Sequence, residues 1–216
     1  MNIAKGSKSL ILSPFIVCVF FLVFFLFFKG EVISAIFLFI SMVFFIITIV
    51  FIIFFRDPVR NIGKGIVACA DGRIRDISNL KDDDVGDCIM VSTFMNLYNV
   101  HINRIPLDGT IKNIIHTKGF HLPAFRKESE KNERVTITVD TKIGIIKIIL
   151  IAGTLARRIS LYIQKGDKMK KGEKIGIIKF GSRVDVYLPT KSIKNIIVKK
   201  GEMVKAGEYT IAEIND

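Results

Sequence analysis

Two long apolar runs near the N-terminus restrict the architecture of this chain more than any other feature. Neither the nineteen residues from Leu10 to Phe28 nor the twenty-four from Val32 to Phe55 include a charged side chain. A helix of either length can cross a hydrocarbon core about 30 Å thick. Because only residues 29–31 separate the runs, we expect two antiparallel helices joined by a tight turn, forming a membrane hairpin over residues 1–55.

Basic residues flank this hairpin on both outer sides, whereas the turn is neutral. They are Lys5 and Lys8 before the first run, and Arg56, Arg60 and Lys64 after the second. The positive-inside rule therefore predicts that everything after residue 56 lies on the cytoplasmic side of the cell membrane. A re-entrant hairpin remains an alternative, because Pro14 interrupts the first run and the turn is short. A cleavable signal peptide is disfavoured, since the run exceeds its usual length and no small-residue cleavage site is present.

The remainder of the chain is strongly basic. The net charge is +12, of which residues 56–216 carry +10. Electrostatic attraction to an anionic lipid surface contributes about 1 kcal/mol of binding free energy for each basic residue that lies near the surface. Since no nucleic-acid-binding motif is present, we expect lipid rather than nucleic acid as the partner. The cysteines at 18, 69 and 88 form no CxxC pair, so they predict neither a zinc site nor a disulfide framework.

Residues 56–216 read as short alternating segments separated by turns. Val135, Ile137 and Val139 are apolar and alternate with Thr136 and Thr138, which is the period of a half-buried strand. No long helical pattern occurs after residue 60. The sequence therefore predicts a mainly β, antiparallel domain, with residues 124–133 as a polar loop or short helical turn.

An internal repeat lies near the C-terminus. Glycines at 166 and 172 are echoed by glycines at 201 and 207, a displacement of 35 residues. Each copy predicts a turn, a short strand, a second turn and a second strand, a pattern typical of barrel-sandwich folds. The Gly181-Ser182 dipeptide lies between the copies, at the start of an alternating segment that ends at Pro189. On local evidence alone this dipeptide is a turn.

Six segments carry a resemblance that covers most of the chain. In order they are FFRDPVR at 54–60, ADGRI at 70–74, VHINRIPLDG at 100–109, KGFHLPAF at 118–125, NER at 132–134 and FGSRVDVYLP at 180–189. Together they make the chain similar to the compact members of the phosphatidylserine decarboxylase family. The resemblance implies a carboxy-lyase that converts a serine phospholipid to the ethanolamine lipid. Ester-linked phosphatidylserine and ether-linked archaetidylserine both remain open as substrates.

The resemblance also implies a proenzyme that cuts itself between Gly181 and Ser182. The Ser182 hydroxyl would attack the Gly181 carbonyl, where glycine has no side chain to obstruct it, and convert the amide to an ester. Elimination would then release the upstream chain and leave dehydroalanine, which hydrolyses to a pyruvoyl group and ammonia. The products would be a β chain, 1–181, and an α chain, 182–216, associated as a heterodimer. A dimer of such heterodimers is left open.

The implied cofactor is the pyruvoyl group made from Ser182. Its ketone would form a Schiff base with the amine of the serine headgroup and accept the electrons released as carbon dioxide departs, as pyridoxal phosphate does elsewhere. Both reactions need proton transfer, for which histidine is suited near neutral pH. His101 is the expected acid that protonates the decarboxylated carbon. A hydrogen-bonded histidine on a strand is the alternative.

The chain departs from the family's longer members at one site position. Those members have H-x-x-H-x-P, and alignment on Pro106 places His101 on the first histidine and Arg104 on the second. In them the second histidine forms a self-processing triad with the aspartate of ADG and the serine. Asp71 and Ser182 match here. The self-cleavage base is therefore either His101 oriented by Asp71 or an arrangement peculiar to compact members.

Other polar residues of the motifs are further site candidates. Arg104, Lys118 and His121 are possible contacts for the substrate, the two basic side chains through the lipid phosphate. Solvated surface is the alternative for Lys118. We interpret NER, residues 132–134, as a structural hydrogen-bonding cluster because it immediately precedes a strand.

A non-enzymatic function is the main alternative. A membrane-anchored barrel-sandwich adaptor or carrier domain would explain the hairpin and the glycine repeat. It would also predict a long coiled-coil hairpin or a modifiable lysine between the repeats, and the sequence shows neither. A pyruvoyl decarboxylase of a soluble amino acid conflicts with the membrane hairpin.

Overall fold

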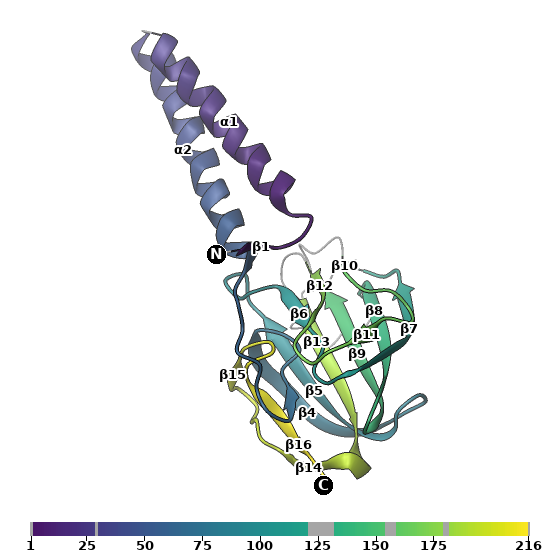
Figure 1. Ribbon diagram of the computed structural model, residues 1–216. Helices are drawn as coiled ribbons and strands as arrows, with labels where there is room; N and C mark the ends of the chain where they lie inside the picture. The colour runs from purple at the N-terminus through teal and green to yellow at the C-terminus, as the bar shows by residue number, and fades with distance from the viewer. Residues whose placement is uncertain (1, 29, 121–131, 154–158, 179–181, 216) are drawn as a thin grey trace. The chain divides into compact units, whose positions relative to one another are not determined.

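The computed structural model describes residues 2–28, 30–120, 132–153, 159–178 and 182–215 (Figure 1). The chain divides into two compact units, Met1–Pro58 and Val59–Asp216. The division falls close to the boundary at 55/56 that the sequence suggests.

The first unit is a helical hairpin. Helix α1 spans Lys8–Phe27 and helix α2 spans Glu31–Phe54, and the two pack along their length. A short antiparallel pair, β1 (Asn2–Ile3) with β2 (Arg56–Asp57), joins the ends of the hairpin. Both helices are long and apolar enough to cross a membrane, and only 11% of each apolar window is buried within the protein. Apolar side chains therefore cover the outer surface of the hairpin, as the sequence predicts.

Few polar contacts hold the two helices together. Ser41 Oγ donates a hydrogen bond to the Cys18 carbonyl at 3.0 Å, and Phe24 packs edge-on against Phe37 with ring centroids 5.6 Å apart. Helix α1 continues through Pro14 without a break. Pro14 therefore does not divide the first apolar run, which removes one argument for a re-entrant arrangement.

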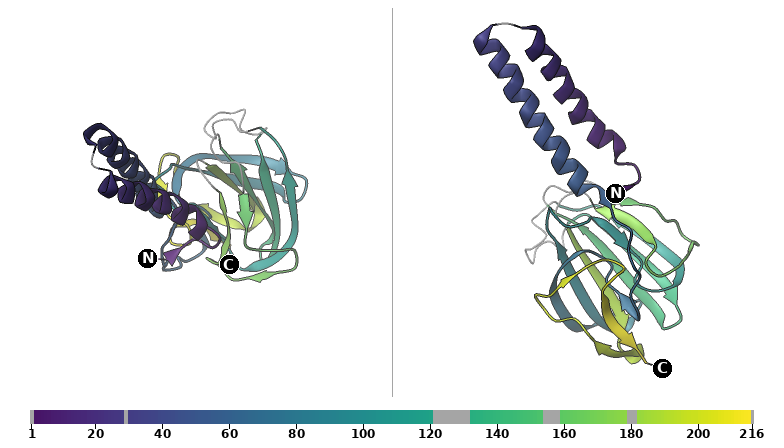
Figure 2. Two further views of the ribbon diagram at one scale, coloured as in Figure 1. Left: turned by 90° about the horizontal axis from the view of Figure 1, so that it is seen from above. Right: turned by 60° about the vertical axis from the view of Figure 1, so that its left-hand side comes forward.

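The second unit is built on an eight-stranded antiparallel sheet that curls into a half-barrel (Figures 1 and 2). The strand order is β11-β7-β8-β9-β13-β5-β4-β15. In chain order the strands are β4 (Gly72–Asp82), β5 (Gly86–Met95), β7 (Gly109–Thr117), β8 (Arg134–Thr141), β9 (Gly144–Ala152), β11 (Lys168–Met169), β13 (Ser182–Pro189) and β15 (Met203–Val204). The predicted fold class, a mainly antiparallel β domain after a two-helix hairpin, is confirmed.

Two three-stranded sheets complete this unit. One has the order β10-β12-β6, and the other β14-β16-β3. Their strands are β3 (Ile66–Val67), β6 (Ile102–Arg104), β10 (Ile159–Leu161), β12 (Lys174–Ile178), β14 (Ile193–Ile196) and β16 (Thr210–Ile214). Within the described part of this unit the only helix is the 3-10 turn η2, Thr190–Ser192, so the prediction that no long helix occurs after residue 60 holds for those residues.

The core lies where the alternating sequence pattern predicts it. Val135, Ile137 and Val139 of β8 are at most 2% exposed, and Val184 and Leu188 of β13 are fully buried. Burying these branched side chains is the main favourable contribution to folding. The central strands of the curled sheet are thereby fixed in register, since a shift by one residue would turn this apolar set to the other face.

The glycine repeat is a structural repeat. Strands β11 and β12 form the first copy, and β15 and β16 form the second, each entered by a positive-φ glycine. The N–H groups of Gly166 and Gly172 donate to the carbonyls of Ile111 and Ile105. Those of Gly201 and Gly207 donate in the same way to Ile74 and Ala68. The predicted turn, strand, turn, strand order is confirmed in both copies.

Candidate active site

Ser182 begins the central strand β13. Its backbone is paired with Ala152 of β9 on one side and with Met95 of β5 on the other, and both neighbours are fully buried. Gly181, and with it the proposed cleavage bond, lies outside the described residues. Ser182 is therefore the first residue of an interior strand rather than part of an exposed turn.

Asp71 immediately precedes β4, and its carboxylate accepts three hydrogen bonds from two donor groups. Arg60 Nη2 lies 2.8 and 3.0 Å from the two carboxylate oxygens, and the Ala206 N–H donates to Oδ1 at 2.8 Å. Arg60 also lies 3.3 Å from Glu208 Oε1. The side chains of Arg60 and Asp71 are 6% and 9% exposed, so they form a buried ion pair. Removing either partner would leave a less well compensated charge in the protein interior.

The glycine of the ADG motif permits a close approach to the site. A Cβ atom at Gly72 would collide with the Phe94 carbonyl oxygen. Phe94 precedes Met95, the partner of Ser182. Glycine at 72 therefore lets the segment that carries Asp71 pack against the end of β5, two strands from Ser182 in the sheet.

His101 is completely buried at the start of the segment that forms β6. Its Nδ1 atom lies 2.9 Å from the Asn99 carbonyl oxygen. A carbonyl oxygen only accepts, so Nδ1 carries the proton and Nε2 is the basic nitrogen of the neutral ring. His101 is thus held in a single tautomer in which Nε2 can receive a proton.

Backbone hydrogen bonds bring the three predicted site segments together. The Arg104 N–H donates to the Cys69 carbonyl at 2.9 Å, which aligns the segment before Asp71 with β6. The Ile178 N–H, at the end of β12, lies 3.3 Å from the His101 carbonyl. β12 is the last described strand before the proposed cut, so its end adjoins the segment that carries His101.

The contacts described for the Asp71 carboxylate go to Arg60 and Ala206, and that described for the His101 ring goes to Asn99. The orientation of His101 by Asp71 remains a prediction.

Burial raises the pKa of the neighbouring Cys69 thiol to about 12, although a hydrogen bond from the Arg104 backbone opposes the change. Cys69 is therefore a neutral thiol and not a nucleophile.

Arg104 occupies the position where the longer relatives have a histidine. Its Nη1 atom donates to the Gly172 carbonyl at 2.7 Å, and the side chain is buried. A Cβ atom at Gly207 would lie 3.0 Å from Arg104 Cδ. Arg104 therefore lies between the second turns of the two repeats. Its contact with a lipid phosphate stays a prediction, as does that of Lys118, which is exposed beyond β7. His121 lies outside the described residues.

The NER segment supports the other neighbour of Ser182. Asn132 Nδ2 donates to the Ala152 carbonyl at 2.8 Å, and the Ala152 N–H donates to the Glu133 carbonyl at 2.9 Å. Asn132 is 1% exposed. These bonds agree with the structural role predicted for the cluster, and they fix β9 at the point where it pairs with residue 182.

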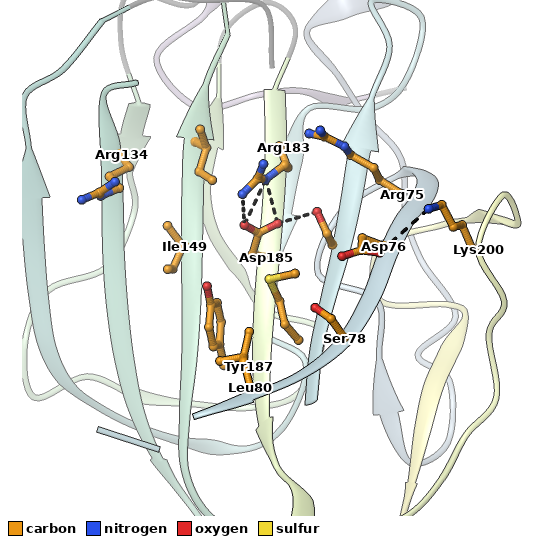
Figure 3. A pocket seen from close by; sticks show the side chains of 13 residues that line it. Arg75, Asp76, Ser78, Leu80, Arg134, Ile149, Arg183, Asp185, Tyr187 and Lys200 are labelled. Atoms are coloured by element: carbon orange, nitrogen blue, oxygen red, sulfur yellow. Dashed lines mark hydrogen bonds and ion pairs between the residues drawn. The ribbon is translucent and has the colours of Figure 1, made fainter. Parts of the chain in front are cut away.

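A polar groove lies on the face of β13 opposite the core (Figure 3). Its volume is about 890 Å³. Asp185 lies in it, accepting hydrogen bonds from Ser92 Oγ at 2.6 Å and from Arg183 at 2.7 and 3.0 Å. Burial, reinforced by the Asp185 charge, raises the pKa of Tyr187 to about 12. The lining carries four basic and two acidic side chains, so its charge suits an anionic group.

Sequence reasoning missed two buried polar residues of the site, Arg60 and Asn103. Arg60 was interpreted only as a basic residue flanking the membrane, yet it pairs with Asp71. Asn103 is fully buried in β6, and its Nδ2 atom lies 3.8 Å from Met95 Sδ. The signal that the sequence offers for Asn103 is its place within the VHINRIPLDG motif.

Comparison with known proteins identifies the family of this chain. The sequence model of the phosphatidylserine decarboxylase family matches residues 47–212. A putative archaetidylserine decarboxylase proenzyme of Methanococcoides burtonii is 44% identical over 163 residues, which cover 74% of this chain and 73% of that protein. The phosphatidylserine decarboxylase proenzymes of Streptomyces griseus and Streptomyces coelicolor are 46% and 50% identical, over 71% and 63% of this chain and 69% and 61% of theirs.

A family model that matches most of the chain, together with relatives of this similarity, defines the class as decarboxylases made as proenzymes. The chain belongs to the phosphatidylserine decarboxylase family. It is therefore a carboxy-lyase of phospholipid biosynthesis, and the resemblance found in the sequence is confirmed.

Proposed function

We propose that this protein decarboxylates a serine phospholipid after cutting itself between Gly181 and Ser182. The observation that carries the proposal is the position of Ser182. It begins an interior strand between two glycine-spaced repeats, beside the segments of Asp71 and His101. The relatives named as proenzymes for phosphatidylserine and archaetidylserine support the same assignment.

For the cut, the Ser182 hydroxyl attacks the Gly181 carbonyl carbon while a base takes the hydroxyl proton. His101 Nε2 is the base we assign, because the Nδ1–H bond to Asn99 leaves Nε2 as the basic nitrogen. The C–N bond breaks as the amide becomes an ester, and the proton moves to the nitrogen of residue 182. Elimination from the ester and reaction with water then give the pyruvoyl group and ammonia.

The surroundings of residue 182 fit a pyruvoyl group. Its strand neighbours, Ala152 and Met95, are fully buried, and the buried Asn103 carboxamide adjoins Met95. When formed, the group supplies a ketone that takes up the serine amine and accepts the electrons released with carbon dioxide. The chain's own contribution is to exclude water with these side chains and to return a proton to the headgroup carbon from His101 Nε2.

The position of β13 supports a heterodimer after the cut. Residues Ser182–Pro189 pair with Cys88–Met95 of β5, and Ser182–Tyr187 pair with Lys147–Ala152 of β9. The α chain would therefore remain in the middle of a sheet supplied by the β chain. We place the second unit on the cytoplasmic side of the cell membrane, where the basic flanks of the hairpin direct it.

Intact-mass measurement on the purified protein tests the proposal. The wild type should give two chains, and the smaller should begin at residue 182 without a free amino group. Ser182→Ala should give one full-length chain with no decarboxylase activity. A single full-length species in an active wild-type preparation would refute the assignment. Assays with ester-linked and ether-linked serine lipids would then identify the substrate. The adaptor alternative is not retained, because the family is one of decarboxylases.

A further inference from the structure

Asn103 is a buried polar residue to which the proposed mechanism gives no role beyond lining the surroundings of residue 182. Its side chain has no solvent exposure. A carboxamide offers two N–H donors and a carbonyl acceptor. The contact described for Nδ2 is with a thioether, Met95 Sδ, at 3.8 Å, which is a weak acceptor. Among the described residues no partner exists for Oδ1. Such incomplete pairing in a protein interior calls for an explanation.

The position of Asn103 connects it with the proposed cut. Met95, which its carboxamide contacts, is the strand partner of Ser182. The backbone of Asn103 pairs with Gly176 of β12, the strand that leads toward the cut. Asn103 therefore links β12, the strand that precedes the proposed cut, with β5, the strand that pairs with residue 182.

Asn103 also shares a face with the proposed base. In a strand, side chains two residues apart point to the same side. His101 directly precedes β6 and Asn103 lies within it, so the two have this spacing, and both are fully buried. Arg104, on the other side of the strand, instead reaches the Gly172 carbonyl. The face that carries His101 thus offers a basic nitrogen and a weakly held amide donor together.

We propose that Asn103 is a further catalytic residue, which donates an N–H hydrogen bond to the oxygen on residue 182. The inference rests on the proposed function. In the precursor the acceptor is Ser182 Oγ, so the hydroxyl proton is directed to the base. After the cut the acceptor is the carbonyl oxygen of the group formed at residue 182. The thioether is easily replaced as a partner because it accepts weakly, and preorganised side-chain donors of this type stabilise charge that develops on oxygen.

Processing kinetics and stability together test this role. The full chain is produced by cell-free synthesis in the presence of lipid nanodiscs, and the fraction of chains that remain uncut is measured as a function of time. Asn103→Leu removes the donor but keeps the volume. We expect its processing to slow by about 100-fold, while its melting temperature does not fall, because an incompletely paired polar group is replaced by an apolar one. A purely structural asparagine would lower the melting temperature instead. Processing at the wild-type rate overturns the proposal.

A second variant tests the donor role of Asn103 even if Asn103→Leu fails to fold. In Asn103→Asp the protonated carboxyl group can donate, whereas the carboxylate cannot. Its processing rate relative to the wild type should therefore rise severalfold as the pH is lowered from 8 to 5. A ratio that does not change with pH contradicts the donor role.

Thr138→Val is the matched control, since Thr138 is a buried polar residue of β8 away from Ser182, and it should be processed normally. If the wild type and this control both stay uncut, the proposed function fails and takes this inference with it. If both are cut and Asn103→Leu is cut equally fast, the inference alone fails.

Discussion

The two glycine-spaced repeats use the same turn but meet side chains of opposite charge. In the first repeat, the Gly172 carbonyl accepts a hydrogen bond from the Arg104 guanidinium at 2.7 Å. In the second, the Ala206 N–H, beside Gly207, donates to the Asp71 carboxylate at 2.8 Å. One turn geometry therefore presents an acceptor to a cation and a donor to an anion. A nearly symmetric scaffold builds an asymmetric site because residues outside the repeats differ.

The repeats also differ in the part of the chain to which each one leads. β12 of the first repeat leads through residues 179–181 to β13, whereas β16 of the second repeat is the last strand of the chain. The first repeat therefore positions the strand that precedes the proposed cut. The second repeat holds the Asp71 side chain through the Ala206 N–H. If this division is correct, substitutions at the two contacts should differ in size and in their effect on processing.

The largest effect is expected at the acidic contact. Asp71→Asn removes the closer of the two carboxylates that pair with the buried Arg60 guanidinium and leaves only Glu208, 3.3 Å away. Breaking a buried pair in this way costs about 3 kcal/mol. The free energy of unfolding can be measured by urea titration with circular dichroism in detergent, in the uncut Ser182→Ala background. Asp76→Asn is the control, because its contact with Lys200 is exposed and 4.0 Å long, and it should change stability by less than about 0.5 kcal/mol. Equal losses in the two variants would contradict the importance of the buried pair.

A smaller effect is expected at the basic contact. Arg104→Met keeps most of the side-chain length but removes the donor to the buried Gly172 carbonyl, which should cost about 1–3 kcal/mol. The same urea titration measures it. Since Arg104 acts on the repeat that leads to the cut, the variant should also process more slowly than wild type in nanodiscs. Unchanged stability with normal processing would show that the hydrogen bond from Arg104 to the Gly172 carbonyl is not needed to hold the turn of the first repeat.

The smallest effect should occur at a charge pair outside both repeats. Lys147 Nζ lies 2.6 Å from Asp82 Oδ1. Burial alone would raise the pKa of Asp82, but hydrogen bonds from Lys147 and from the Asp84 and Val85 N–H groups lower it overall. The pair therefore stabilises the fold above the unfolded pKa of about 4, and this contribution is lost as the pH falls through the folded value.

Lys147→Met should thus lower the free energy of unfolding by about 0.5–1 kcal/mol at pH 7 and make it less sensitive to acid below about pH 4. Urea titrations at pH 7 and pH 3 measure both quantities. An acid dependence identical to that of wild type would show that the pair contributes nothing.

Much of the fold could be predicted because it depends on local patterns. The two apolar runs are long enough to determine the hairpin, and alternation in Val135–Val139 determines a strand and its buried face. The repeat was visible because each copy needs glycine where φ is positive, at 166 and 172 and again at 201 and 207. These requirements act on neighbouring residues, so they can be read along the chain.

The site was predictable only in part. Ser182, Asp71 and His101 were found through motifs, but the partners that hold them come from distant segments. Arg60 is eleven residues from Asp71 and looks like any basic residue next to a membrane segment. Asp185 and Arg183 alternate with the core residues of β13, yet they are only 1% and 8% exposed, and they pair with one another. Pairing of this kind depends on tertiary packing, which no local pattern encodes.

The central place of β13 has a consequence for the order of events in the life of the protein. Residue 182 is placed only once β5 and β9, both made earlier in synthesis, flank the strand that contains it. If the cut occurs as proposed, a chain that has not assembled its sheet has no reactive geometry and acquires no cofactor. The presence of the cut and of the cofactor in a molecule would then show that its sheet had assembled correctly.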